Sequence, residues 1–267
     1  MSWWGKVIGG TFGFVMGGPL GAVLGAALGN YFDGGMDRIT ADDALLGAGG
    51  ADPRTNERVQ TAFFTAVFSL MGYIAKADGK VSRDEISLAQ QVMGQMQLQA
   101  EQKKLAIGLF EQGKQSEFPY VQVLEQFKRE CQRRRNLIQM FLEILTATAL
   151  ADGEMDPAER RVLESIAASL GYAKADYDRL IMRMSAQYRF TTDETPEQKL
   201  NDAYKVLGLT PSADVAEVKK AYRKLMSQHH PDKLVSKGLP EEMMAMATKK
   251  TQEIKTAYET ITAQRGD

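Results

Sequence analysis

The chain has 267 residues, which is enough for one large domain or two small ones. A net charge of −1 argues against a general nucleic-acid binder, and apolar and charged fractions of 44% and 25% are those of a globular protein. One cysteine, Cys131, excludes an intramolecular disulfide, and two adjacent histidines are too little material for a histidine-rich metal site or a Ser-His-Asp triad, so the composition favours a binding protein over an enzyme.

The first 32 residues have the composition of a membrane anchor. No charged residue occurs between Lys6 and Asp33, and a helix over that stretch would be about 39 Å long, which is enough to cross a bilayer. Pro19 would remove one helical hydrogen bond and bend such a helix. We therefore expect a transmembrane anchor over 1–32, with a cleaved signal peptide as the alternative, because "GAVLGAALGN" offers small residues for cleavage.

Within this anchor, glycine recurs at every fourth position. On a helix this spacing gives a slowly winding stripe of small residues, and repeated GxxxG lets two backbones approach closely in lipid. The stripe therefore predicts a homodimer through the transmembrane helix. Its members are Gly5, Gly9, Gly13, Gly17, Gly21, Gly25 and Gly29.

Residues 33–57 are rich in Gly and Asp and predict a flexible linker, whereas 58–187 have a helical pattern that contains an internal repeat. The copies "AKADGKVSRDEISLAQQVMGQM" and "ALADGEMDPAERRVLESIAASL" begin at Ala75 and Ala149, 74 residues apart. Each copy predicts a helix, a tight Asp-Gly turn and a second helix that opens with a capping box. The expected capping pairs are Ser82 with Glu85 and Asp156 with Glu159.

The repeat resembles the TerB-like helical domain of tellurite-resistance-type proteins, whose signature is A-D-G-x-apolar-x-x-x-E. That resemblance raises a divalent-metal or ligand role for the acidic residues of the two copies. The alternative is that they only form turns and caps, and an EF-hand is not supported because the D-x-D-x-D ladder is missing. The residues concerned are Asp78, Glu85, Asp152 and Glu159.

Before the second copy, "FKRECQRRRNL" at 127–137 forms a basic patch. We interpret it as a solvated helix face, with contact to acidic lipid headgroups as the alternative. Cys131 within the patch is expected to be a small packed residue without a catalytic base. A short polar linker follows over 188–197, where Thr195, Pro196 and Gln198 have the pattern of a helix start.

The segment 198–267 contains three helices with the same apolar spacing of i, i+3, i+4 and i+7. Asp214 with Glu217 caps the second helix, and Pro231 requires that helix to end at His230. A metal site on the adjacent histidines and Asp232 is disfavoured, because neighbouring histidines point in different directions. The three apolar faces are Leu200, Ala203, Tyr204 and Leu207; Val218, Ala221, Tyr222 and Leu225; and Ile254, Ala257, Tyr258 and Ile261.

The stretches "AYKVLGL", "EVKKAYRKLMSQHHPDK" and "EIKTAYETI" resemble the J domain of DnaJ/Hsp40 co-chaperones. The resemblance implies docking on ATP-bound Hsp70, which in bacteria is DnaK, and stimulation of its ATP hydrolysis. It further implies an essential loop of His230, Pro231 and Asp232 and a docking face of Lys219, Lys220, Arg223 and Lys224. No Gly/Phe-rich segment or CxxCxGxG repeat follows, which favours a localised recruiter of Hsp70 over a client-holding chaperone.

Taken in order, anchor, TerB-like domain and J domain resemble a family of membrane-anchored bacterial DnaJ-like co-chaperones. The expected fold is all-α. The resemblance implies a single-pass inner-membrane protein with a periplasmic N-terminus and a cytoplasmic bulk, a homodimer that binds DnaK, and a link to envelope-stress and capsule-synthesis signalling. Neither a cofactor nor a catalytic residue is expected. The alternative is a membrane sensor or adaptor whose TerB-like domain binds a metal or small ligand.

Overall fold

The computed structural model describes residues 17–29, 53–77, 93–94, 96, 98–131, 134–150, 155–190 and 195–265. Regular structure within these ranges is helical, in agreement with the expected all-α fold. The elements are α3 (Gly18–Gly29), α4 (Pro53–Ala75), α6 (Ala100–Gly113), α7 (Tyr120–Cys131), α8 (Arg135–Ala149), α9 (Pro157–Ser169), α10 (Lys174–Phe190), α11 (Pro196–Val206), α12 (Val215–His229), α13 (Pro231–Val235), the 3-10 turn η2 (Glu241–Met243) and α14 (Met244–Arg265).

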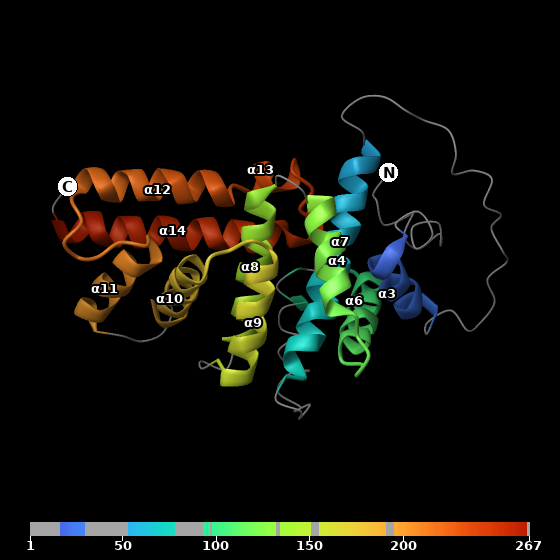
Figure 1. Cartoon of the computed structure of the whole chain (residues 1–267). Helices are drawn as coiled ribbons and strands as arrows, with labels where there is room; N and C mark the ends of the chain where they lie inside the picture. The colour runs from blue at the N-terminus through green and yellow to red at the C-terminus, as the bar shows by residue number, and fades with distance from the viewer. Residues whose placement is uncertain are drawn as a thin grey trace.

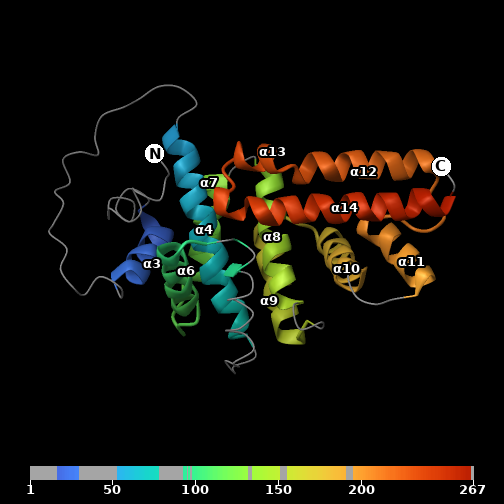
Figure 2. The same cartoon turned by 180° about the vertical axis from the view of Figure 1, so that it is seen from behind.

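The helices form two groups that meet at α8 (Figures 1 and 2). On one side, α4 packs against α6, α7 and α3. On the other side, α12 and α14 lie along each other and α11 packs on α14. Helix α8 contacts members of both groups, α4 and α12, and therefore links the expected TerB-like domain to the expected J domain.

Helix α4 is the centre of the first group. Residues 61–72 of this helix are all buried, because "TAFFTAVFSLMG" is apolar around nearly its whole circumference. The contact with α6 is close at two glycines: a Cβ on Gly72 would lie 2.0 Å from the Phe110 carbonyl oxygen, and one on Gly113 would lie 1.7 Å from that of Ser69. The two backbones therefore touch where side chains are absent.

Helix α3, the second half of the expected anchor, packs against α6, α7 and α4. Gln126 of α7 holds its first turn: the side-chain oxygen accepts from the Leu20 amide at 2.8 Å, and the side-chain nitrogen donates to the Gly17 carbonyl at 2.9 Å. The buried face of α3 is Leu20, Val23, Leu24 and Ala27.

The apolar faces predicted for α11, α12 and α14 are confirmed. All twelve residues either belong to one core, between α11, α12 and α14, or pack against it. Tyr222 and Tyr258 stack across the α12–α14 contact with ring centroids 4.3 Å apart. The apolar spacing in the sequence therefore determines how α12 and α14 pack together in the helical hairpin.

Three of the four predicted capping boxes are confirmed, and the fourth, Ser82 with Glu85, lies outside the described residues. They open α9, α11 and α12, and in each the side chain before the helix pairs with the third helical residue. The linkers differ from the expectation at their edges: α4 begins at Pro53 inside the expected range 33–57, and α10 continues to Phe190 inside 188–197. Pro53 takes the first helical position, where its missing N–H is not needed.

Candidate functional site

The His-Pro-Asp loop lies at the bend where α12 ends and the chain turns toward α14 (Figure 1). Helix α12 ends at His229, and His230 leaves helical geometry with φ −58° and ψ 123°. Pro231 is the first residue of the short helix α13, which explains the break, since a proline disfavours helical geometry in the residue before it. His230 and Asp232 are exposed on either side of the proline ring.

A basic surface runs along α12 up to this loop. Val218 and Leu225 of α12 are buried in the J-domain core, so the opposite side of the helix faces solvent. All four cations expected for docking are exposed on it. Lys233 adds a positive charge beyond the loop, and its ammonium donates to the Ser227 hydroxyl at 2.8 Å.

The neighbouring histidine points inward. His229 is 2% exposed, and its Nδ1 lies 2.9 Å from the Leu225 carbonyl oxygen one turn earlier. Its Nε2 lies 2.9 Å from Oε2 and 3.1 Å from Oε1 of Glu143, a residue of α8 that is itself 3% exposed. The two histidines thus have different roles: His230 is presented to solvent, and His229 ties the end of α12 to the TerB-like domain.

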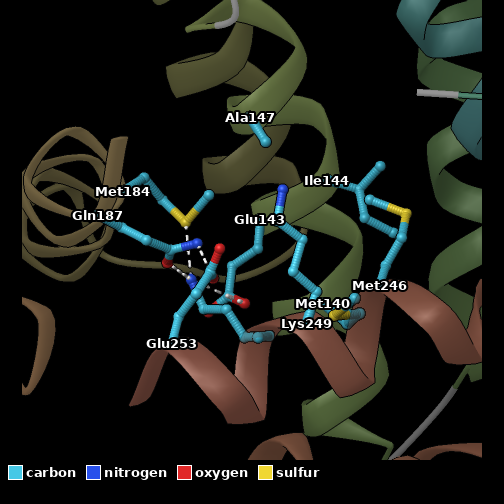
Figure 3. A pocket seen from close by; sticks show the side chains of 10 residues that line it. Met140, Glu143, Ile144, Ala147, Met184, Gln187, Met246, Lys249 and Glu253 are labelled. Atoms are coloured by element: carbon cyan, nitrogen blue, oxygen red, sulfur yellow. Dashed lines mark hydrogen bonds and ion pairs between the residues drawn. The ribbon is translucent and has the colours of Figure 1, made fainter. Parts of the chain in front are cut away.

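Glu143 is the centre of a buried charge cluster. Arg183 Nη2 of α10 lies 3.2 Å from its Oε1, and Lys250 Nζ of α14 lies 3.9 Å from its Oε2. Glu143 of α8, Gln187 of α10 and Glu253 of α14 line a pocket of about 100 Å³. Figure 3 shows their side chains pointing toward one another. Burial alone would raise the pKa of the Glu143 carboxyl, but the positive charges facing it hold this pKa well below its ordinary value.

Other contacts join the same two parts of the chain around the loop. The Asn136 side chain donates to the Gln228 carbonyl at 3.3 Å, just before the loop. Beyond the loop, the Arg134 side chain donates to the Lys237 carbonyl, and the Gln102 side-chain amide donates to the Glu242 carboxylate at 2.8 Å. The His-Pro-Asp loop is therefore held to the TerB-like domain on both of its sides.

Gly238 lies where the segment after the loop is in close contact with the TerB-like domain. Its φ of 96° is a conformation that residues with a Cβ rarely adopt, and a Cβ there would lie 2.8 Å from both Val59 Cγ1 and Arg134 Nη1. The segment that follows the loop, from α13 into the first turn of α14, contributes apolar side chains to the core around α4 rather than to the J-domain core. These side chains are Leu234, Leu239, Met243 and Ala247.

This junction was not predicted from the sequence, which suggested two units separated by a linker. One signal was available: Glu143 is a lone carboxylate within the apolar run "NLIQMFLEILTATA", where a charge requires a buried partner. His229, at the end of an amphipathic helix, is a residue of matching chemistry. The two residues are 86 positions apart in the chain, and no sequence pattern indicates that they are in contact.

Of the four expected TerB-like acids, only Glu159 lies among the described residues. Glu159 accepts from the Asp156 amide at 3.2 Å, as the cap interpretation predicts, whereas Asp78, Glu85 and Asp152 lie outside the described residues. Among the described residues, no group of three or more His, Cys, Asp or Glu is placed to hold a metal ion.

The basic patch at 127–137 is only partly a solvated face. Lys128, Arg129 and Arg135 are exposed, as that interpretation expects, and Lys128 also donates to the Ser169 carbonyl at 2.9 Å. Arg134 is half-buried and donates to the Lys237 carbonyl of the J domain, and Arg133 lies outside the described residues. Cys131 is buried, as expected, and burial raises the pKa of its thiol to about 12. It is therefore an unreactive packed side chain rather than a nucleophile.

The structure describes only the second half of the glycine stripe. Gly17 precedes α3 with a φ of 55°, Gly21 is buried, and Gly25 is exposed with nothing within 4 Å of a Cβ built on it. Gly29 ends the helix, whereas Gly5, Gly9 and Gly13 lie outside the described residues.

An exposed His-Pro-Asp loop at the bend of a helical hairpin, beside a basic helix face, defines a J-domain co-chaperone. The DnaJ domain family model matches residues 202–265, and the model of tellurite resistance protein TerB matches 64–182. A co-chaperone protein DjlA from Vibrio cholerae serotype O1 is 44% identical over 284 aligned positions, covering 100% of this chain and 99% of that protein. The chain belongs to the DjlA family of co-chaperones, which are not enzymes.

Two further relatives are also DjlA co-chaperones. The one from Photobacterium profundum is 40% identical, covering 98% of this chain and 99% of its own length. The one from Coxiella burnetii is 47% identical, covering 76% of this chain and 78% of its own length. No solved structure matches the chain.

The comparisons also address the anchor. Residues 1–39 match the family model described as the co-chaperone DjlA transmembrane domain, which indicates that the chain is anchored in a membrane. Within the ranges that the structure describes, no helix combines the length and the apolar character needed to cross a bilayer.

Proposed function

We propose that this co-chaperone recruits DnaK to the inner membrane and stimulates its ATP hydrolysis through the His-Pro-Asp loop. The observation that carries the proposal is the exposure of His230 and Asp232 at the bend after α12. The Asp232 carboxylate offers two oxygens for a bidentate contact with an arginine of the partner. Pro231 fixes the backbone between the two side chains, so little conformational freedom is lost when they bind.

The exposed cations of α12 extend this surface. Positive charge beside a loop with one carboxylate steers an acidic partner and orients it before contact. Because these side chains are solvent-exposed, their contribution falls as salt screens it over about 8 Å at physiological ionic strength. We therefore propose that the cations of α12 contribute to the affinity and the association rate, and that the His-Pro-Asp loop stimulates ATP hydrolysis.

The test is ATP turnover by DnaK at increasing concentrations of the full chain in detergent micelles. We expect His230→Gln to abolish stimulation while the helical content and the melting temperature of the variant stay unchanged, because the side chain is exposed. Full stimulation by folded His230→Gln would refute the proposal.

A charge reversal tests the docking face in the same assay. Lys219→Glu combined with Lys220→Glu raises the concentration needed for half-maximal stimulation, and added salt narrows the difference from wild type. Lys255→Glu, at an exposed position of α14, is the matched control and leaves that concentration unchanged. Equal effects of the two reversals would exclude α12 as the docking face.

We further propose a homodimer through the glycine stripe of the anchor, with the N-terminus periplasmic and the remaining chain cytoplasmic, where DnaK and ATP are found. Gly25→Leu tests the stripe, since the space around Gly25 is open and the change creates no clash in the described fold. We expect this variant to weaken self-association in a membrane reporter assay, whereas the neighbouring Ala26→Leu does not. Undiminished association of Gly25→Leu would remove the stripe as the dimer contact.

The family resemblance also supports a role in envelope-stress and capsule-synthesis signalling. If so, overproduction of the wild-type chain should induce a capsule-synthesis reporter, and equal overproduction of His230→Gln should not. Unchanged induction would separate signalling from the J domain.

A further inference from the structure

The loop that faces Hsp70 is built partly on another domain. Its flanks are held by Asn136 and Arg134, and the side chains that follow the loop are buried in the core around α4. The J-domain core, by contrast, lies farther along the hairpin, between α11, α12 and α14. The TerB-like domain therefore forms the base on which the loop rests.

The strongest point of this base lies directly before the loop. His229 is followed at once by His230, so the position of its ring fixes where α12 ends and where the loop begins. Nδ1 faces the Leu225 carbonyl and Nε2 faces the Glu143 carboxylate, and both of these groups are acceptors. Contacts on both ring nitrogens, one to the helix itself and one to α8, therefore hold the ring in one orientation.

Glu143 is in turn held in one orientation. The Gln139 side-chain amide donates to its Oε1 at 3.0 Å from the preceding turn of α8, and Arg183 contacts the same oxygen. Arg183 belongs to α10, His229 to α12 and Lys250 to α14. The Glu143 carboxylate is therefore contacted from three helices other than its own. A side chain held this way transmits the position of α8 to the end of α12.

We propose that Glu143 is a positioning residue for stimulation of the Hsp70 ATPase. It fixes His229 and thereby holds the exposed His-Pro-Asp loop in the orientation that acts on the partner. The inference rests on the proposed function and deepens it: the TerB-like domain contributes a residue to J-domain activity without touching the partner.

A positioning role and a purely structural role predict different kinetics. If Glu143 positions the loop, its loss lowers the maximal stimulation at saturation, while the exposed basic face of α12 still binds and leaves the half-saturating concentration unchanged. If Glu143 only keeps the chain folded, its loss reduces the active fraction. The half-saturating concentration then rises, and the maximum is retained.

The experiment measures DnaK ATP turnover against the concentration of the full chain in detergent micelles, for wild type, Glu143→Gln, Glu111→Gln and His230→Gln. Glu143→Gln keeps the shape of the side chain and removes the charge. Glu111→Gln makes the same change at a half-exposed residue of α6 whose ion pair with Lys114 lies within one helix. We expect Glu143→Gln to lower the maximal stimulation by about tenfold at a half-saturating concentration within about twofold of wild type, since a displacement of about 1 Å is enough to cost up to 100-fold in rate.

Glu111→Gln should match wild type in both parameters. A wild-type maximum for Glu143→Gln, or a raised half-saturating concentration at an unchanged maximum, would overturn the inference. If Glu143→Gln does not fold, Gln139→Ala decides by the same two parameters, because it removes a hydrogen bond that orients the Glu143 carboxylate and leaves its charge in place. The proposed function fails separately, when wild type does not stimulate DnaK or when His230→Gln stimulates fully.

Discussion

Gly238→Ala provides a test of the junction between the two domains that does not depend on activity. Gly238 has a φ of 96°, and a Cβ there would lie 2.8 Å from Val59 Cγ1 and from Arg134 Nη1. The unfavourable backbone conformation costs about 1–2 kcal/mol for a residue with a Cβ. Forcing a methyl group against the buried Val59 adds about 1–3 kcal/mol, typical of overpacking a core.

Gly171→Ala is the matched control for the backbone cost. Gly171 has a φ of 86°, but nothing lies within 4 Å of a Cβ built on it. Both variants carry the conformational cost, and only Gly238→Ala carries the clash between the J-domain loop and α4.

The assay is thermal unfolding of the full chain in micelles, followed by circular dichroism. At about 2–4 °C per kcal/mol for a chain of this size, Gly238→Ala should melt about 2–12 °C below Gly171→Ala. Equal melting temperatures for the two variants would refute the close packing of the loop on the TerB-like domain.

Three further predictions follow from individual side chains. The pKa of Glu143 is held below its ordinary value of 4.5, so the stability that its charge contributes is complete above about pH 4.5 and is lost as the pH falls further. The melting-temperature gap between wild type and Glu143→Gln should therefore shrink between pH 5 and pH 3, and a widening gap over that range would contradict the assignment. Because burial raises the pKa of Cys131 to about 12, a thiol reagent at pH 8 should label the native chain slowly and the denatured chain at once, and rapid native labelling would show an accessible thiol. Asp214 accepts from the Glu217 amide at 2.7 Å, so Asp214→Ala should lower the free energy of unfolding by about 1 kcal/mol in denaturant titration, and an unchanged value would show that this cap does not stabilise α12.

Much of the J domain was predictable because its determinants are local. The ends of α12 follow from two short-range effects, the capping pair of Asp214 with Glu217 and the restriction that Pro231 places on His230. The apolar spacing of three helices then gives the core, since side chains three and four positions apart share one helix face. The exposure of the His-Pro-Asp loop follows from the same pattern.

The junction between domains was not predictable, because its contacts join residues far apart in sequence. Glu143 and His229 each had a signal, a charge within an apolar run and a histidine at the end of a helix, but no local rule pairs them. The apolar residues after the loop, such as Leu234 and Leu239, fit the J-domain core equally well in a sequence pattern. Their burial against α4 depends on the tertiary arrangement of α8, which brings the two helix groups together.

The most direct measurement of the central claim is single-turnover hydrolysis by DnaK preloaded with ATP and mixed with a saturating amount of the full chain. Wild type should accelerate the hydrolytic step, Glu143→Gln should accelerate it far less, and His230→Gln should leave it at the rate of DnaK alone. An equal acceleration by all three chains would contradict the claim that an exposed His-Pro-Asp loop, held in place by the TerB-like domain, activates the partner.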